Sequence, residues 1–154
     1  MMDRFPPILD IEQVIAHRGA MRLVDRVIDY DDERIAVAVD VPHDGLFHSA
    51  HGVPAWVGIE YMAQAVACWA GCMARLRGVP PPVGFLLGTR RYECTVPHFE
   101  PGLSLQIQAQ REVMGDNGLG VFACRILVGD EELAQAHVSV FEPPDAKAFL
   151  DGGA

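Results

Sequence analysis

The sequence predicts an α+β fold in which one antiparallel sheet curls around a single long helix. An apolar run of helical period occupies residues 54–76, and strand-like runs separated by turn signals lie on both sides of it. A helix that is apolar all round has to be buried by the rest of the chain, so the strands are expected to wrap it. The length of 154 residues suits one domain, 1–154, with a core over 17–142 and a loosely packed tail over 143–154.

The part before the long helix predicts a short helix followed by a hairpin. Asp10 is placed to cap a helix over 11–17, because a carboxylate accepts hydrogen bonds from the first free N–H groups of a helix. Residues 21–31 and 33–41 form two strand-like runs joined by an acidic turn, which is typical of a hairpin. Residues 42–53 break the alternation and are expected to be a loop.

The long helix is expected to run from about Pro54 to Leu76. Proline is favoured in a first helical turn, and Gly78 followed by Val-Pro-Pro-Pro ends the pattern. After this break come four strand-like stretches without a further helix, namely 84–96, 103–114, 118–128 and 132–143. Glycine-rich turns between the last three favour an antiparallel run.

Composition and charge exclude several classes of function. A net charge of −9 argues against general nucleic-acid binding, which needs a basic surface. Residues 1–10 lack an apolar signal core and the nearly uncharged run 61–74 is too short to span a bilayer, so a cytoplasmic protein without a membrane partner is expected. The four cysteines have no metal-type spacing, and no phosphate-binding loop or nucleophile elbow is present, so we expect no metal and no cofactor.

One carboxylate lies inside the apolar helical run. Glu60 is followed one turn later by Gln64, whose amide could orient it. Spacing alone leaves two interpretations open: an exposed first-turn glutamate that the helix dipole favours, or a sheltered carboxylate that is kept for chemistry.

Three segments carry a family resemblance. HRGAMRLVDRV (17–27) resembles the HRxPxLLVDRV signature of 3-hydroxyacyl-acyl carrier protein dehydratases of the hot-dog fold. IEYMAQA (59–65) is similar to the Glu-x-Met-Ala-Gln helix of that family, and residues 84–107 are similar to its strand, Pro-Gly turn and next strand. The segments PAWVGIEYMAQ (54–64) and FLLGTRRY (85–92) most resemble the subgroup associated with aryl polyene pigment biosynthesis.

The resemblance implies a dehydratase that converts a 3-hydroxyacyl thioester on acyl carrier protein to the trans-2-enoyl product. It also implies a dimer with sites at the interface, where a loop histidine of one chain faces a helix glutamate of the other. Glu60 takes the position of that glutamate and would need a raised pKa to donate a proton, as desolvation provides. Backbone N–H groups of Ala55 and Trp56 would bind the thioester carbonyl, and Gln64 would orient Glu60.

The histidine loop departs from the family pattern. The family places its histidine fourteen residues before the glutamate, and that offset falls on Leu46 here. His48 and His51 are the alternatives in the loop, and His51 is the preferred base. A homologous chain could instead supply the histidine, which would make the protein half of a heterodimer rather than a homodimer. A catalytically inactive partner subunit and an acyl-thioester hydrolase are the other two interpretations.

A carrier protein is acidic, so an acidic enzyme needs a local basic patch to bind it. The candidates are two pairs of arginines, one near the end of the long helix and one on the following strand: Arg75, Arg77, Arg90 and Arg91.

Overall fold

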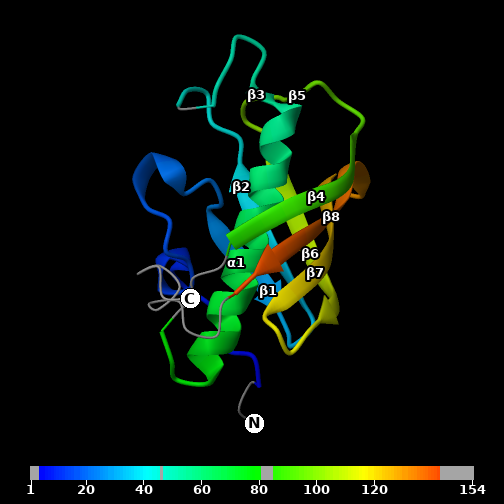
Figure 1. Ribbon diagram of the computed structural model, residues 1–154. Coiled ribbons are helices and arrows are strands. Elements are labelled where there is room, and N and C mark those ends of the chain that lie inside the picture. Colours follow the sequence, from blue (N-terminus) through cyan, green and yellow to red (C-terminus); the bar gives the residue numbers. More distant parts are fainter. Residues whose placement is uncertain (1–3, 46, 81–84, 143–154) are drawn as a thin grey trace, which may run out of the picture.

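A six-stranded antiparallel sheet curls around one long helix in the computed structural model, which describes residues 4–45, 47–80 and 85–142 (Figure 1). The strand order is β1-β2-β6-β7-β8-β4. The bounds are α1 Gly58–Leu76, β1 Arg26–Tyr30, β2 Arg34–Asp40, β4 Phe85–Cys94, β6 Ser104–Met114, β7 Leu119–Val128 and β8 Glu131–Phe141. The predicted α+β class and hot-dog architecture are confirmed. The predicted tail, 143–154, lies outside the described residues.

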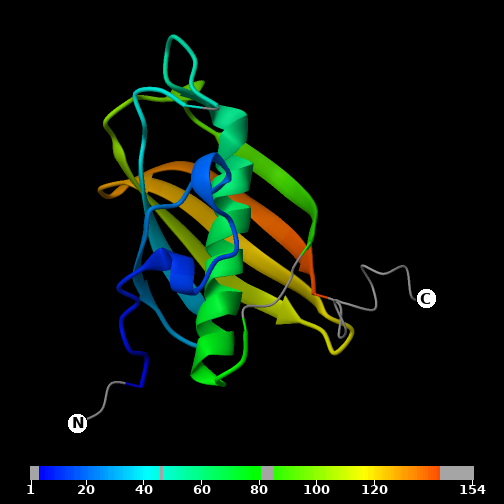
Figure 2. The same cartoon turned by 90° about the vertical axis from the view of Figure 1, so that its left-hand side faces the viewer.

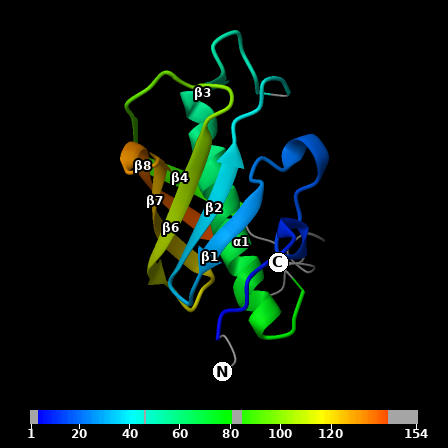
Figure 3. The ribbon, with the colours of Figure 1, turned by 180° about the vertical axis from the view of Figure 1, so that it is seen from behind.

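A hairpin of β1 and β2 forms as predicted, but its first strand is shorter than the expected run 21–31, because β1 begins at Arg26 and Gly19–Met21 is a 3₁₀ turn. The Asp31 side chain accepts hydrogen bonds from the Glu33 and Arg34 N–H groups at 2.8 and 2.9 Å, which fixes the turn. β2 then pairs with β6 along its whole length (Figure 3). The inward residues of these two strands, such as Val37 and Ile107, are fully buried. Apolar alternation therefore sets which face of the sheet meets the helix.

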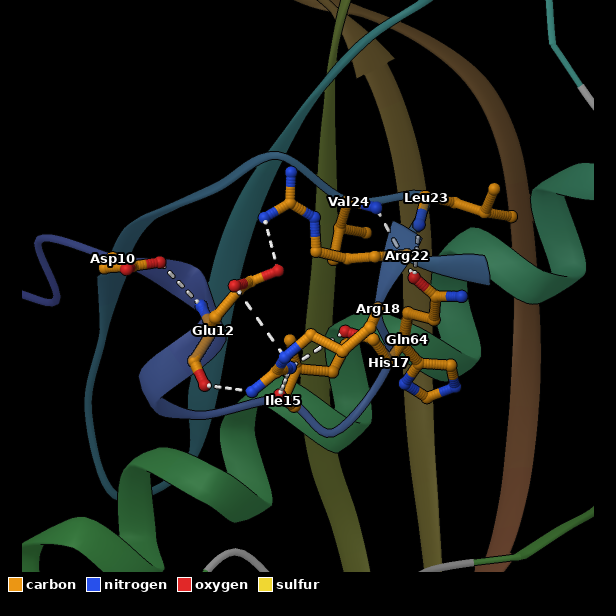
Figure 4. A network of polar contacts seen from close by, with 9 residues as sticks. All are labelled: Asp10, Glu12, Ile15, His17, Arg18, Arg22, Leu23, Val24 and Gln64. Carbon is orange, nitrogen blue, oxygen red and sulfur yellow. Dashed lines mark hydrogen bonds and ion pairs between the residues drawn. The ribbon is translucent and has the colours of Figure 1, made fainter. Parts of the chain in front are cut away.

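The expected helix over 11–17 is only a 3₁₀ turn, Ile11–Gln13. Asp10 does cap it, accepting a hydrogen bond of 2.9 Å from the Glu12 N–H. Beyond the turn, however, the Arg18 guanidinium donates to the carbonyls of Glu12 and Ile15, at 3.1 and 2.6 Å (Figure 4). In an α-helix over 11–17 the Glu12 carbonyl would accept from the Ala16 N–H, so here the Arg18 side chain takes the place of that backbone donor.

The long helix begins later than predicted. Residues Ala55–Val57 form a separate 3₁₀ turn, and α1 starts at Gly58, although its end at Leu76 is as predicted. The cause is tertiary: the Ala55 N–H donates to the Pro97 carbonyl at 3.0 Å, and the Tyr92 hydroxyl donates to the Ala55 carbonyl at 2.6 Å. At the same end, a short ladder pairs β3 (Val53–Pro54) with β5 (His98–Phe99).

The sheet does not enclose the helix completely. Figure 2 shows α1 along the open side of the curled sheet, with the N-terminal segment beside it. One stripe of the helix stays half-buried in the single chain, and it consists of Ile59, Ala63, Ala67, Ala70 and Met73. The expectation of a helix wrapped on every side is wrong for this stripe. Within the described residues, no helix has both the length and the hydropathy to cross a membrane.

Candidate functional site

The side chain of Gln64 joins α1 to the segment that precedes β1. Its carbonyl oxygen accepts hydrogen bonds from the N–H groups of Leu23 and Val24, at 2.8 and 3.4 Å. Its amide nitrogen donates to the Met21 carbonyl at 2.8 Å. Figure 4 shows the Gln64 side chain facing the N–H groups of Leu23 and Val24. With only 1% of its surface exposed, Gln64 is the polar residue held inside the described core. These bonds fix the amide in one orientation.

Glu60 accepts a hydrogen bond from the same amide nitrogen. The Gln64 amide nitrogen donates to Glu60 Oε1 at 3.2 Å, so the rigid amide aims one side of the carboxylate. Glu60 is half-buried and shares a helix face with Ala63 and Ala67, at the edge of the half-buried stripe. No ion pair found among the described residues includes Glu60. The carboxylate is therefore oriented without being neutralised by a cation of its own chain.

A pocket of about 210 Å³ lies beside this end of α1. His48 lines it, and the His48 Nε2 atom is buried without a hydrogen-bond partner among the described residues. Asp25 and Tyr61 line it too, and burial raises the pKa of Asp25 above its ordinary value. Burial, followed by the charge of Asp25, raises the pKa of Tyr61 to about 12. Sequence reasoning missed both residues, although Tyr61 directly follows Glu60.

The two loop histidines occupy different environments. His51 is exposed, does not line this pocket, and has its ring 5.5 Å from that of His98. His48 is half-buried and lines the pocket, so within one chain His48, and not the preferred His51, adjoins this cavity. In the part of the chain that the structure describes, no hydrogen bond or ion pair joins either histidine to Glu60. Leu46, the family position, lies outside the described residues.

The backbone donors at the helix start are only partly available. The Ala55 N–H already binds the Pro97 carbonyl, so the expectation that it binds a thioester oxygen is wrong for this structure. Trp56 remains a candidate donor. Its side chain is 62% exposed, and its ring meets Phe47 edge-on with 5.7 Å between the centroids.

The four arginines do not form one patch within a single chain. Arg75 and Arg77 are exposed at the end of α1, where Arg77 lines a groove with Trp69 and Arg111. Arg90 and Arg91 line a different hollow on β4, together with Glu112 and His137. Within the described part of the chain, no group of three or more His, Cys, Asp or Glu residues is arranged to hold a metal ion.

Comparison with known proteins identifies the family. The model of the ApeP-like family, described as ApeP dehydratase, matches residues 9–151. The chain belongs to this dehydratase family. It is 33% identical over 135 residues to the 3-hydroxyacyl-[acyl-carrier-protein] dehydratase FabZ of Thermus thermophilus, covering 84% of this chain and 92% of FabZ.

Solved structures agree with this assignment. A chain of the dehydratase heterocomplex ApeI:P from Xenorhabdus doucetiae superposes with a TM-score of 0.85 at 28% identity, over 96% of this chain and 99% of that one. A hypothetical thioesterase protein from Streptococcus pneumoniae has a TM-score of 0.60 at 11% identity, over 76% and 84% of the two chains, and shares the fold alone.

Proposed function

We propose that the chain supplies Glu60 to a site that dehydrates 3-hydroxyacyl thioesters carried on acyl carrier protein. The observation that carries the proposal is the Gln64 clamp, which orients the Glu60 carboxyl from a fully bonded, buried amide. A glutamate that only increases solubility would not require a buried amide that orients its carboxyl group. Similarity to FabZ of Thermus thermophilus supports the substrate class.

In the proposed reaction, a base removes a proton from C2 and the C3 hydroxyl leaves with a proton from the Glu60 carboxyl. The products are one water molecule and the trans-2-enoyl thioester, and the proton that the base took returns to Glu60 between turnovers. General acid–base catalysis of this kind contributes about 10²–10⁴-fold to a rate. Charge on the thioester oxygen would be stabilised by backbone donors at the start of α1, such as the Trp56 N–H.

We further infer that the base is a histidine of a homologous dehydratase chain in a heterodimer. In this chain the family position is Leu46 and His51 is exposed, and among the described residues no hydrogen bond or ion pair joins His48 to Glu60. A second chain packed on the half-buried stripe would cover Glu60 and bring a histidine from outside. The similarity to the heterocomplex ApeI:P supports this arrangement. The acidic carrier would bind one of the two arginine pairs, Arg90 and Arg91 or Arg75 and Arg77. The pair that it binds would be the one beside the entrance to the dehydratase site in the dimer.

The absence of histidine at position 46 specifically favours a second candidate, a non-catalytic subunit that stabilises an active homologue. The experiment uses the purified chain, alone and mixed with a homologous dehydratase, and a 3-hydroxyacyl-carrier substrate. Mass spectrometry follows the loss of water from the carrier-bound acyl group. Free carrier thiol without an enoyl product would indicate a thioester hydrolase instead.

The decisive variant is Glu60→Gln, with Glu100→Gln as a matched control, because Glu100 is an exposed glutamate outside α1, on the turn directly after β5. We expect Glu60→Gln to reduce dehydration about 10²–10⁴-fold, and Glu100→Gln to leave it unchanged. Full turnover by the mixture containing Glu60→Gln would remove Glu60 from the mechanism and leave the non-catalytic role.

A further inference from the structure

Tyr92 of β4 holds the turn that leads into α1. Its hydroxyl donates a hydrogen bond of 2.6 Å to the Ala55 carbonyl, while the Ala55 N–H donates to the Pro97 carbonyl at 3.0 Å. Both polar backbone groups of Ala55 are therefore fixed by the same stretch of chain, β4 and the residues that follow it. Burial, mainly, raises the pKa of Tyr92 above its ordinary value, so the phenol stays protonated as a donor.

A β-bulge aims Tyr92 at this turn. The pairing of β4 with β8 passes from Arg90↔His137 to Glu93↔Gln135, so β4 contains one residue more than its partner strand. Arg91, within the bulge, has φ +56°, a left-handed conformation that is unfavourable for a residue with a side chain. In a regular strand Tyr92 would share the outer face with Arg90. The bulge turns it inward instead.

Gly58 gives the phenol room to approach. A Cβ atom at position 58 would lie 2.2 Å from the Tyr92 hydroxyl oxygen and 2.9 Å from Ile126 Cδ1. Those separations are below contact distance, so the close approach requires a residue without a side chain here. The first residue of α1 and the bulge on β4 are thus matched to each other across the core.

We propose that Tyr92 is a positioning residue for the dehydratase site, fixing the 3₁₀ turn Ala55–Val57 and the first turn of α1, from which Trp56 and Glu60 project. The inference rests on the proposed function, since positioning matters only where these groups meet a substrate. Gln64 fixes the Glu60 carboxyl from one turn further along, and Tyr92 fixes the backbone that carries it. Misplacing a reacting group by a fraction of an ångström costs roughly tenfold or more in rate.

Trp56 lies on the turn itself and reports its mobility. Replacing the second tryptophan by Trp69→Phe leaves Trp56 as the sole indole. Tyr92→Phe then removes one hydroxyl, and Tyr30→Phe is the matched control because the Tyr30 hydroxyl also donates to a backbone carbonyl, that of Pro6, at 2.7 Å. If the Trp69→Phe background fails to fold, acrylamide quenching in the natural chain replaces anisotropy, since Trp69 is only 6% exposed.

We expect Tyr92→Phe to lower the fluorescence anisotropy of Trp56 and to reduce kcat about tenfold with KM unchanged, while Tyr30→Phe changes neither. Unchanged anisotropy, or an unchanged kcat in an active complex, overturns the inference. An equal loss in Tyr30→Phe also overturns it, because the effect would then be one of stability. If the natural chain is inactive in every mixture, the proposed function fails, and the anisotropy alone decides whether Tyr92 holds the turn.

Discussion

Replacing Gln64 by methionine tests the clamp on which the candidate site depends. Methionine has a similar size and shape but can neither accept from the Leu23 and Val24 N–H groups nor donate to the Met21 carbonyl. Val24 is completely buried and Leu23 half-buried, so water cannot fully replace the lost acceptor. Met21 is 57% exposed, so we expect its carbonyl to regain a partner from solvent.

The cost follows from the groups left without partners. A buried donor that loses its acceptor costs about 1–3 kcal/mol. Leu23 is only half-buried and the Val24 bond is long at 3.4 Å, so each N–H group is given the lower part of that range, and the pair sums to about 2–4 kcal/mol. Removing the buried polar amide itself offsets about 1 kcal/mol of this, which leaves a net destabilisation of about 2 kcal/mol. With a urea slope of about 2 kcal/mol/M, the unfolding midpoint should fall by about 1 M.

Urea unfolding followed by circular dichroism measures this shift. Gln108→Met is the matched control, because Gln108 lies half-buried on the sheet and bonds the Gln106 side chain at 2.8 Å and, at 3.4 Å, the Arg125 side chain. We expect that control to change the free energy of unfolding by less than about 0.5 kcal/mol. A Gln64→Met variant as stable as the Gln108→Met variant would refute the argument that the amide locks α1 to the segment before β1.

Three further predictions follow from packing and burial. Gly71→Ala should lower the free energy of unfolding by about 1–3 kcal/mol in urea, because its Cβ would lie 1.8 Å from the Val14 carbonyl oxygen. A Cβ at Gly88 would meet no atom of the described residues within 4 Å, so Gly88→Ala should be neutral. With a thiol reagent, Cys94 should react first, since it alone is half-buried while burial raises the pKa of the other three thiols; four equal rates would contradict this. Burial raises the pKa of Tyr61 to about 12, so the folded state favours the protonated phenol. The contribution of Tyr61 to the free energy of unfolding is therefore fully present below pH ~10 and is lost as the pH rises toward 12. Tyr61→Phe should flatten this fall in unfolding experiments across that range, and an unaltered pH profile would contradict it.

Much of the fold could be predicted because its signals are local. Alternation in β2 and β6, the Asp31 turn and the glycine after α1 act within a few residues of their own position. The errors fell where a distant segment intervened. The Arg18 side chain donates to the Glu12 carbonyl within the expected N-terminal helix. Ala55 donates to the Pro97 carbonyl and accepts from the Tyr92 hydroxyl, and a 3₁₀ turn forms where the first helical turn was expected.

The candidate site divides in the same way. Glu60 and Gln64 could be paired from the sequence, because positions four apart on a helix are neighbours. The choice between His48 and His51 could not, because a loop without periodicity does not determine which side chain faces inward. Nor could it be predicted from the sequence that the Ala55 N–H would donate to the Pro97 carbonyl, or that Arg90 and Arg77 would line different hollows.

The sequence by itself determined the order of the elements, the apolar face of each strand and the helix face that carries Glu60. The tertiary structure alone decided that Gln64 is anchored to the segment before β1, that a bulge turns Tyr92 onto the start of α1, and that one stripe of the helix is left partly open. The physical reason is range. Periodicity and turn chemistry act over a few bonds, whereas these three features depend on atoms that meet only after the sheet has curled around the helix.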